Sequence, residues 1–387
     1  MAYTGVKYLH SELSGAPVLN GTPGSMLAVL EACLCNGWGL QTATSVVVSN
    51  GIATATLPAG HAFEPGRIAL VAGAVPTGLN GEQRIKSTTG NSASWEVALP
   101  DGSATGTITL KLAPAGWVKA LSSANVAAFR SASAAASGVF VRIDDSNAQY
   151  ARIRLAESMP DINTLIGPTP TDQQASDGLY ISKSGAVSSA ARRWILVASE
   201  KFVVLAVAYN GSYLSDYEAY VFGDYPSLRV GDPYNSIIIA NLTNSSGSSS
   251  PGTNNALLSP QSANGVYLVR SYVGVGGSMQ GYCNKIGGGS GWSGVSSFPV
   301  GPNPINNGID LCPTSIIEGV SGTGNRRGML PAVYGIPHNL GAAFDSKDII
   351  PDVLGLPGHS ILAVRFYGAS SASGSYRFAI DITGPWE

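Results

Sequence analysis

The chain has 387 residues, of which only 12% are charged, and its formal net charge is −2. A chain of this length can bury a large core and form two or three domains. It has no basic block, which excludes the clustered Lys/Arg surface that nucleic-acid binding needs. No run reaches the about 18 apolar residues that span a membrane, and Met1–His10 has no signal-peptide pattern. We therefore expect synthesis in a cytosol, without membrane insertion.

Residues 1–41 are predicted to form an extended polar arm followed by one short amphipathic helix. Ser25 is a candidate N-cap, apolar residues then recur at helical spacing, and Asn36-Gly37 is a stop signal. So short a helix must pack on the following domain or on a neighbouring subunit. We predict that arm and helix anchor the chain in an assembly through Pro17, Leu19, Met26, Leu27, Leu30 and Leu34.

Residues 42–118 are predicted to form a small β-sandwich. Asn50-Gly51 separates two β-prone runs, which is a strong hairpin signal. About six short strands at regular spacing favour a compact sandwich. The segment Ala113–Trp117 breaks the strand pattern and marks the predicted boundary.

Residues 119–387 are predicted to form a larger antiparallel β-sandwich, so that the whole chain is mostly β. Residues 140–144 and 151–155 alternate polar and apolar, as half-buried antiparallel strands do. Residues 194–197 and 202–207 are more apolar and are expected to be central strands. The Ser/Gly-rich stretches 241–257 and 274–294 are expected to be loops.

No nucleophile elbow, Walker loop, zinc-ligand cluster or EF-hand occurs in the sequence. Glycoside hydrolysis needs only two carboxylates, and three acid pairs are available. In strand and turn contexts such acids more often cap turns or face solvent. We therefore predict that the protein is not an enzyme and uses no cofactor or metal. The acid pairs are Asp144 with Asp145, Asp216 with Glu218, and Asp224 with Asp232.

The histidines and cysteines lack the spacing of a metal site. His10, His61, His338 and His359 lie in turn-rich contexts without a second ligand nearby. Cys33 and Cys35 are expected to be buried thiols on the helix. Cys283 and Cys312 lie in Gly-rich segments and could form a disulfide.

Tyrosines cluster between positions 209 and 234. Tyrosine rings bind sugars by stacking, although core packing and subunit contact explain tyrosines in strands equally well. The candidates for contact with a glycan or a partner are Tyr209, Tyr213, Tyr217 and Tyr220, with Tyr225 and Tyr234 nearby.

Five phrases along the chain resemble virion structural proteins of the tail or baseplate type from tailed bacteriophages. They are Ala16–Gly21, Gly24–Leu27, Thr105–Trp117, Arg327–Pro331 and Asp381–Trp386. The resemblance covers nearly the whole chain except residues 241–257 and 274–294, and it carries no catalytic residues. It implies a virion component, assembled in the host cytoplasm, that contacts other virion proteins and forms a homo-oligomer in the particle. A tail, baseplate or neck component is the first expectation, and a host-surface glycan-binding protein and a head decoration protein are the alternatives. A depolymerase that uses one of the acid pairs is the rival from the class of enzymes.

Overall fold

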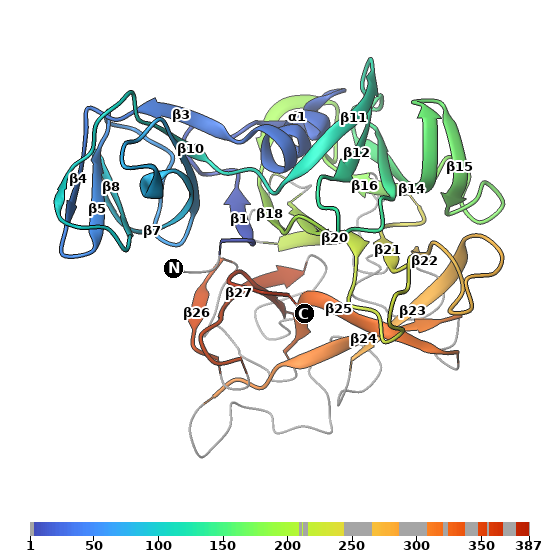
Figure 1. The fold of residues 1–387 in the computed structure, drawn as a ribbon. Helices are drawn as coiled ribbons and strands as arrows, with labels where there is room; N and C mark the ends of the chain where they lie inside the picture. Colours follow the sequence, from blue (N-terminus) through green and yellow to red (C-terminus); the bar gives the residue numbers. More distant parts are fainter. Residues whose placement is uncertain are drawn as a thin grey trace.

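The computed structural model describes residues 4–208, 211, 216–243, 265–285, 308–319, 324–336, 347–353, 356–366 and 377–386. Across these residues the chain is mostly β with a single α-helix, which confirms the predicted fold class (Figure 1).

An eight-stranded sheet forms the blue and teal unit at the left of Figure 1. Asn50 and Gly51 both have positive φ, at 51° and 74°, and they form the predicted hairpin turn. Trp95 is fully buried in this unit. A 3₁₀ turn, Thr77–Leu79, precedes its longest strand. In sheet order the strands are β3 (Trp38–Thr42), β10 (Thr109–Leu112), β6 (Ile68–Ala72), β7 (Gly81–Thr89), β8 (Ser92–Glu96), β5 (Ile52–Thr56), β4 (Ser45–Ser49) and β9 (Gly102–Ser103).

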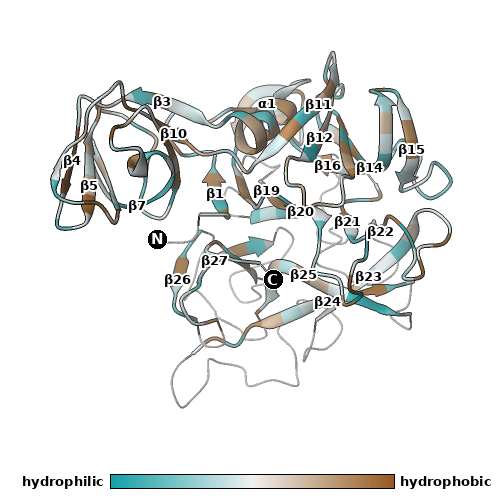
Figure 2. Ribbon diagram, viewed as in Figure 1, coloured by the Kyte–Doolittle hydropathy of each residue, from teal (hydrophilic) through white to brown (hydrophobic). Residues whose placement is uncertain are grey.

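A six-stranded antiparallel sheet follows directly in the chain. Its strands carry one polar and one apolar face, and in Figure 2 hydrophilic and hydrophobic residues both occur along them. The path is β11 (Trp117–Ser123), β12 (Val126–Ser131), β13 (Phe140–Asp144), β14 (Tyr150–Asp161) and β15 (Thr164–Thr169), while β16 (Leu179–Ser182) pairs with β14.

A twelve-stranded sheet forms the rest of the core. Parallel pairing of β20 (Asp216–Asp224) with β27 (Ser360–Phe366) closes the part of the sheet between these two strands into a ring around a buried apolar cluster. The residues predicted as one large sandwich contribute strands to the six-stranded sheet, to this sheet and to a two-stranded sheet. In sheet order the strands are β1 (Lys7–His10), β18 (Trp194–Ala198), β19 (Phe202–Val207), β20 (Asp216–Asp224), β21 (Ser236–Ile239), β22 (Val266–Leu268), β23 (Met279–Lys285), β24 (Cys312–Glu318), β25 (Arg326–Gly335), β28 (Arg377–Asp381), β27 (Ser360–Phe366) and β26 (Ile349–Pro351).

The N-terminal segment is part of this core and not a separate extended arm. β1 pairs with β18 at the edge of the twelve-stranded sheet, and β2 (Leu19–Gly21) pairs with β17 (Ser188–Arg192). The helix α1 (Ser25–Glu31) continues as a π-helical turn, Ala32–Asn36, and ends at Gly37 as the stop signal predicts. The prediction of an irregular arm was wrong because the strand partners lie about 190 residues away in sequence.

Candidate functional site

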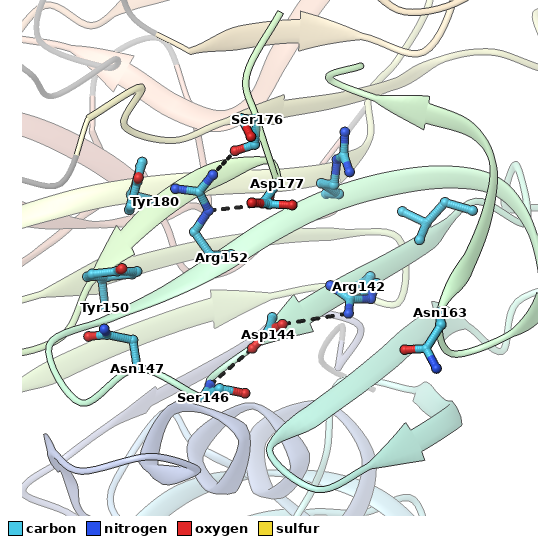
Figure 3. Close-up of a pocket in the computed structure, with 12 residues that line it drawn as sticks. Arg142, Asp144, Ser146, Asn147, Tyr150, Arg152, Asn163, Ser176, Asp177 and Tyr180 are labelled. Carbon is cyan, nitrogen blue, oxygen red and sulfur yellow. Dashed lines mark hydrogen bonds and ion pairs between the residues drawn. The ribbon is translucent and has the colours of Figure 1, made fainter. Parts of the chain in front are cut away.

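A polar pocket of about 500 Å³ opens on the six-stranded sheet (Figure 3). Strands β13, β14 and β16 form its floor, and the loops around them form its walls. Its lining residues are Arg142, Asp144, Ser146, Asn147, Tyr150, Arg152, Arg154, Asn163, Leu165, Ser176, Asp177 and Tyr180.

Successive side chains of a strand point to opposite faces of the sheet, and this alternation produces the polar floor. On β13, Val141 and Ile143 are buried in the core, so Arg142 and Asp144 point to the other face. On β14 the alternation continues, and Tyr150, Arg152 and Arg154 share that outer face, as the pocket lining shows.

The strand register then brings charges from distant positions together. Arg142 lies opposite Arg154, and Asp144 lies opposite Arg152 across the β13–β14 pair. Arg152 in turn lies opposite Tyr180 on β16. Three strands therefore present one row of aspartate, arginine and tyrosine.

Each of the three guanidinium groups is held by a neighbouring loop. In all three arginines the Nε–H donates a hydrogen bond to a backbone carbonyl oxygen, which fixes the plane of the head group. The acceptors are Ile162 for Arg142 at 3.0 Å, Asp177 for Arg152 at 3.3 Å and Pro170 for Arg154 at 3.1 Å.

Two tyrosines flank the middle arginine. The Arg152 Cζ lies 3.7 Å from the ring centroid of Tyr180, in a cation–π contact. The Tyr150 and Tyr180 rings meet edge to face, with centroids 5.0 Å apart and planes at 71°. Both tyrosines are partly exposed, so the pocket offers aromatic surface beside hydrogen-bond donors.

The three arginines of the pocket differ in their charge partners. Arg154 forms an ion pair with Asp172 and Arg142 faces Asp144, whereas Arg152 has no carboxylate partner among the described residues. The Asp144 carboxylate lies 3.6 Å from Arg142, beyond ordinary hydrogen-bond distance. Arg154 is 8% exposed at the floor, and its Nη2 donates to Asp172, at 2.8 Å, outside the pocket.

The residues predicted for assembly pack inside the chain itself. Leu19, Met26, Leu30 and Leu34 are 0% exposed in the main core cluster. Leu27 is partly buried against the same cluster. The backbone carbonyl of Pro17 accepts a hydrogen bond from the indole of Trp194 at 3.0 Å. Of the two packing partners considered for the helix, the structure provides the chain's own domains.

Two of the four tyrosines predicted to contact a glycan or a partner, Tyr217 and Tyr220, form no exposed face. Tyr217 and Tyr220 are each 1% exposed, because β20 lies inside the twelve-stranded sheet. The Tyr220 hydroxyl donates to Glu218 at 2.5 Å. Tyr209 and Tyr213 lie outside the described residues, as do residues 244–257 and 286–294 of the predicted Ser/Gly-rich loops. The prediction of a loop over 274–294 was wrong at residues 279–285, which form the strand β23.

The acid pairs serve separate structural contacts. Asp144 faces the pocket, whereas Asp145 is fully buried and its Oδ2 accepts the Met26 and Leu27 amides at the start of α1, at 2.8 and 3.3 Å. This carboxylate, and not a side chain at Ser25, caps the helix. The other acids are likewise paired: Asp216 with Arg365, Glu218 with Tyr220 and Asn241, Asp224 with Ser137 and Ser236, and Asp232 with Arg327.

The histidines and cysteines form no metal cluster within the described parts of the chain. His10 contacts Glu64 at 3.3 Å, and His359 contacts Asp381 at 2.8 Å. His338 lies outside the described residues. Cys283 and Cys312 are free thiols, so the possible disulfide between them is not formed.

Sequence reasoning found the two alternating strands but missed the pocket. The sequence did contain a signal for the pocket, namely the polar residues that alternate with the apolar ones in these two strands. They are Arg142, Asp144, Arg152 and Arg154. Only the register between β13, β14 and β16 shows that these side chains meet.

No family model and no curated protein matches the chain. Among solved structures the chain is similar to the phage phi92 endosialidase, with 11% sequence identity and a TM-score of 0.16. The match covers 89% of this chain and 52% of the endosialidase chain, so the protein spans about half the length of that neighbour. A TM-score this low carries no argument about function. None of the helices in the described residues is long and apolar enough to cross a bilayer.

Proposed function

We propose that the protein is a saccharide-binding component of a tailed-phage particle. The pocket on the six-stranded sheet carries the binding part of this proposal. The particle part rests on the resemblance of five sequence phrases to virion structural proteins. Other virion proteins and further copies of the chain are the expected partners in the particle, and a host-surface glycan is the expected ligand.

The lining of the pocket matches the chemistry of a sugar. Sugars combine many hydroxyl groups with a flat apolar ring face, which aromatic side chains bind by stacking. Tyr150 offers a partly exposed ring. Asn147 and Asn163 each carry both a donor and an acceptor, and both line the same pocket. Tyr150 lies on the strand β14, which limits the entropy that it loses on binding, and the two asparagines lie in the turns beside it.

A connector role in a tail, baseplate or neck was the first expectation from the resemblance. The helix that was expected to anchor the chain packs in the chain's own core, so the structure offers the pocket, and not the helix, as the contact site. Head decoration is compatible with a saccharide pocket that faces outward. The proposal includes no catalytic step, because one member of each acid pair is held by a structural partner: Asp145 by Lys183, Glu218 by Tyr220 and Asp232 by Arg327.

The test is binding of the purified chain to immobilised bacterial surface oligosaccharides, both neutral and acidic. We expect Tyr150→Ala to weaken binding about tenfold, because it removes the ring face. Tyr272→Ala is the matched control, since Tyr272 is also partly exposed but lies outside the pocket. Binding that survives Tyr150→Ala unchanged, or no binding by the parent chain, would contradict the proposal.

A further inference from the structure

We infer that the pocket selects an acidic saccharide and that Arg152 and Arg142 bind its carboxylate through their Nη groups. This inference rests on the proposed saccharide binding and adds the class of sugar. The ring of the acidic sugar would lie against Tyr150.

Unused donors are the first observation. In each of the three arginines Nε is occupied by a carbonyl oxygen, and Nη2 of Arg152 and Arg154 is also occupied. Nη1 makes no hydrogen bond to any described residue in all three. The Nη1 groups of Arg142 and Arg152 are therefore the donors that stay available to a ligand in the pocket.

The orientation of the head groups is the second observation. An Nε–H that donates to the backbone fixes the guanidinium plane and turns the Nη end away from that carbonyl. The Arg152 guanidinium also stacks on the Tyr180 ring, with Cζ 3.7 Å from the ring centroid, and this contact further restrains the orientation of the guanidinium plane. A planar, restrained guanidinium matches a carboxylate, which accepts two parallel N–H bonds.

The charge balance is the third observation. The Asp144 carboxylate lies 3.6 Å from Arg142, so this internal acid only weakly satisfies that guanidinium. Arg154 is paired with Asp172, but Arg152 donates only to backbone carbonyls and has no carboxylate partner among the described residues. A neutral sugar that displaces water would leave charged donors without a charged acceptor, whereas an acidic sugar supplies one.

The experiment compares matched ligands. The probes are oligogalacturonate and oligosaccharides that end in N-acetylneuraminate, each beside its carboxyl-reduced neutral form, with binding measured by titration against the purified chain. We expect at least one acidic probe to bind about tenfold or more tightly than its reduced form. The difference should shrink as NaCl is raised, because salt screens exposed charges.

Variants link the selectivity to the arginines. Arg152→Gln and Arg142→Gln should each reduce affinity for the acidic probe about tenfold and leave the reduced probe nearly unchanged. Arg152→Lys should not restore affinity, because an ammonium group lacks the planar fork. Arg130→Gln is the control, because Arg130 is an exposed arginine on the same sheet but outside the pocket. Its Cζ lies 5.5 Å from the centroid of the Phe140 ring. Thermal unfolding of each variant shows whether the variant is folded. If Arg152→Gln does not fold, Arg142→Gln still tests the inference.

The outcomes separate the two proposals. Equal affinity for acidic and reduced probes, or loss of affinity for both forms in the arginine variants, overturns the acidic selectivity and leaves saccharide binding in place. No binding of any neutral or acidic oligosaccharide overturns both.

Discussion

A buried ion pair connects the helix to the six-stranded sheet. Asp145 and Lys183 both have side chains that are 0% exposed, and the Lys183 ammonium donates to Asp145 and, at 2.8 Å, to the carbonyl of Thr22. The same aspartate caps the α1 amides. Burial raises the pKa of Asp145 and lowers the pKa of Lys183. Each charge is therefore tolerated only because the other is present.

We predict that Asp145→Asn lowers the free energy of unfolding by about 3–5 kcal/mol, because it leaves the ammonium of Lys183 buried without its counter-charge. Chemical denaturation monitored by circular dichroism measures this change. Asp144→Asn is the control, since that neighbour faces the open pocket. In the double variant Asp145→Asn/Lys183→Met part of the loss should be recovered. If Asp145→Asn lowers the free energy of unfolding no more than Asp144→Asn does, the ion pair between Asp145 and Lys183 does not stabilise the fold.

The thiols give a prediction for pH. Burial raises the pKa of Cys35 to about 11 and that of Cys283 to about 12. It also raises the pKa of Cys33. Only the thiolate attacks a disulfide reagent, so the folded chain should react slowly at pH 8 and quickly once denatured.

Labelling with a chromogenic disulfide, followed by mass spectrometry of the peptides, measures both rates. As the pH is raised toward 11, Cys35 should react before Cys33, since it is half-buried while Cys33 is fully buried. Rapid labelling of Cys33 in the folded chain at pH 8 would contradict the burial described here.

At the scale of elements, α1 acts as a core element. Leu30 is 0% exposed among residues of the main core cluster. Leu30→Ala should cost about 2–5 kcal/mol, because the cavity that it leaves can close only in part. Leu27→Ala, on the partly exposed side of the helix, should cost clearly less. Equilibrium unfolding of the two variants provides the comparison, and equal costs would show that the helix is not packed as described.

Deleting residues 1–36 extends this argument to the whole N-terminal segment. The deletion removes the edge strand β1, the strand β2 and the helix from their pairings and their core. We expect the truncated chain to be insoluble or to lose its cooperative unfolding transition. A soluble, cooperatively folded remainder would instead support the detachable anchor expected from the sequence.

Local signals in the sequence predicted most of the elements. Asn50-Gly51 marks a turn whose positive φ angles few other residue pairs adopt easily, and Asn36-Gly37 ends the helix for a similar reason. Strands such as 140–144 and 202–207 follow from apolar periodicity. Pairing of β1 with β18 depends on contacts between distant segments, and a strand's own periodicity carries no information about its partner. The pocket was missed for the same reason, because it exists only through the register of three strands.

At the scale of the molecule, the eight-stranded sheet is self-contained in its pairing. Among the described strands, β3 to β10 pair only with one another, and all lie between residues 38 and 112. The apolar core is nevertheless continuous, since one cluster joins residues of this sheet, of α1 and of both other sheets. Trp38 marks the junction, with its ring 6.3 Å from that of Trp194 in the twelve-stranded sheet.

We predict that residues 37–116 fold when expressed alone, because backbone hydrogen bonding within the sheet needs no strand from outside it. The measurement is tryptophan fluorescence during denaturation of the Trp38→Phe variant, which leaves Trp95 as the core reporter. We expect a single cooperative transition and emission typical of a buried indole. A gradual transition with solvent-exposed emission would mean that the continuous core, and not strand pairing, holds this sheet. The α1 contacts would then stabilise two sheets at once, and Leu30→Ala should destabilise the eight-stranded sheet in the full chain as well.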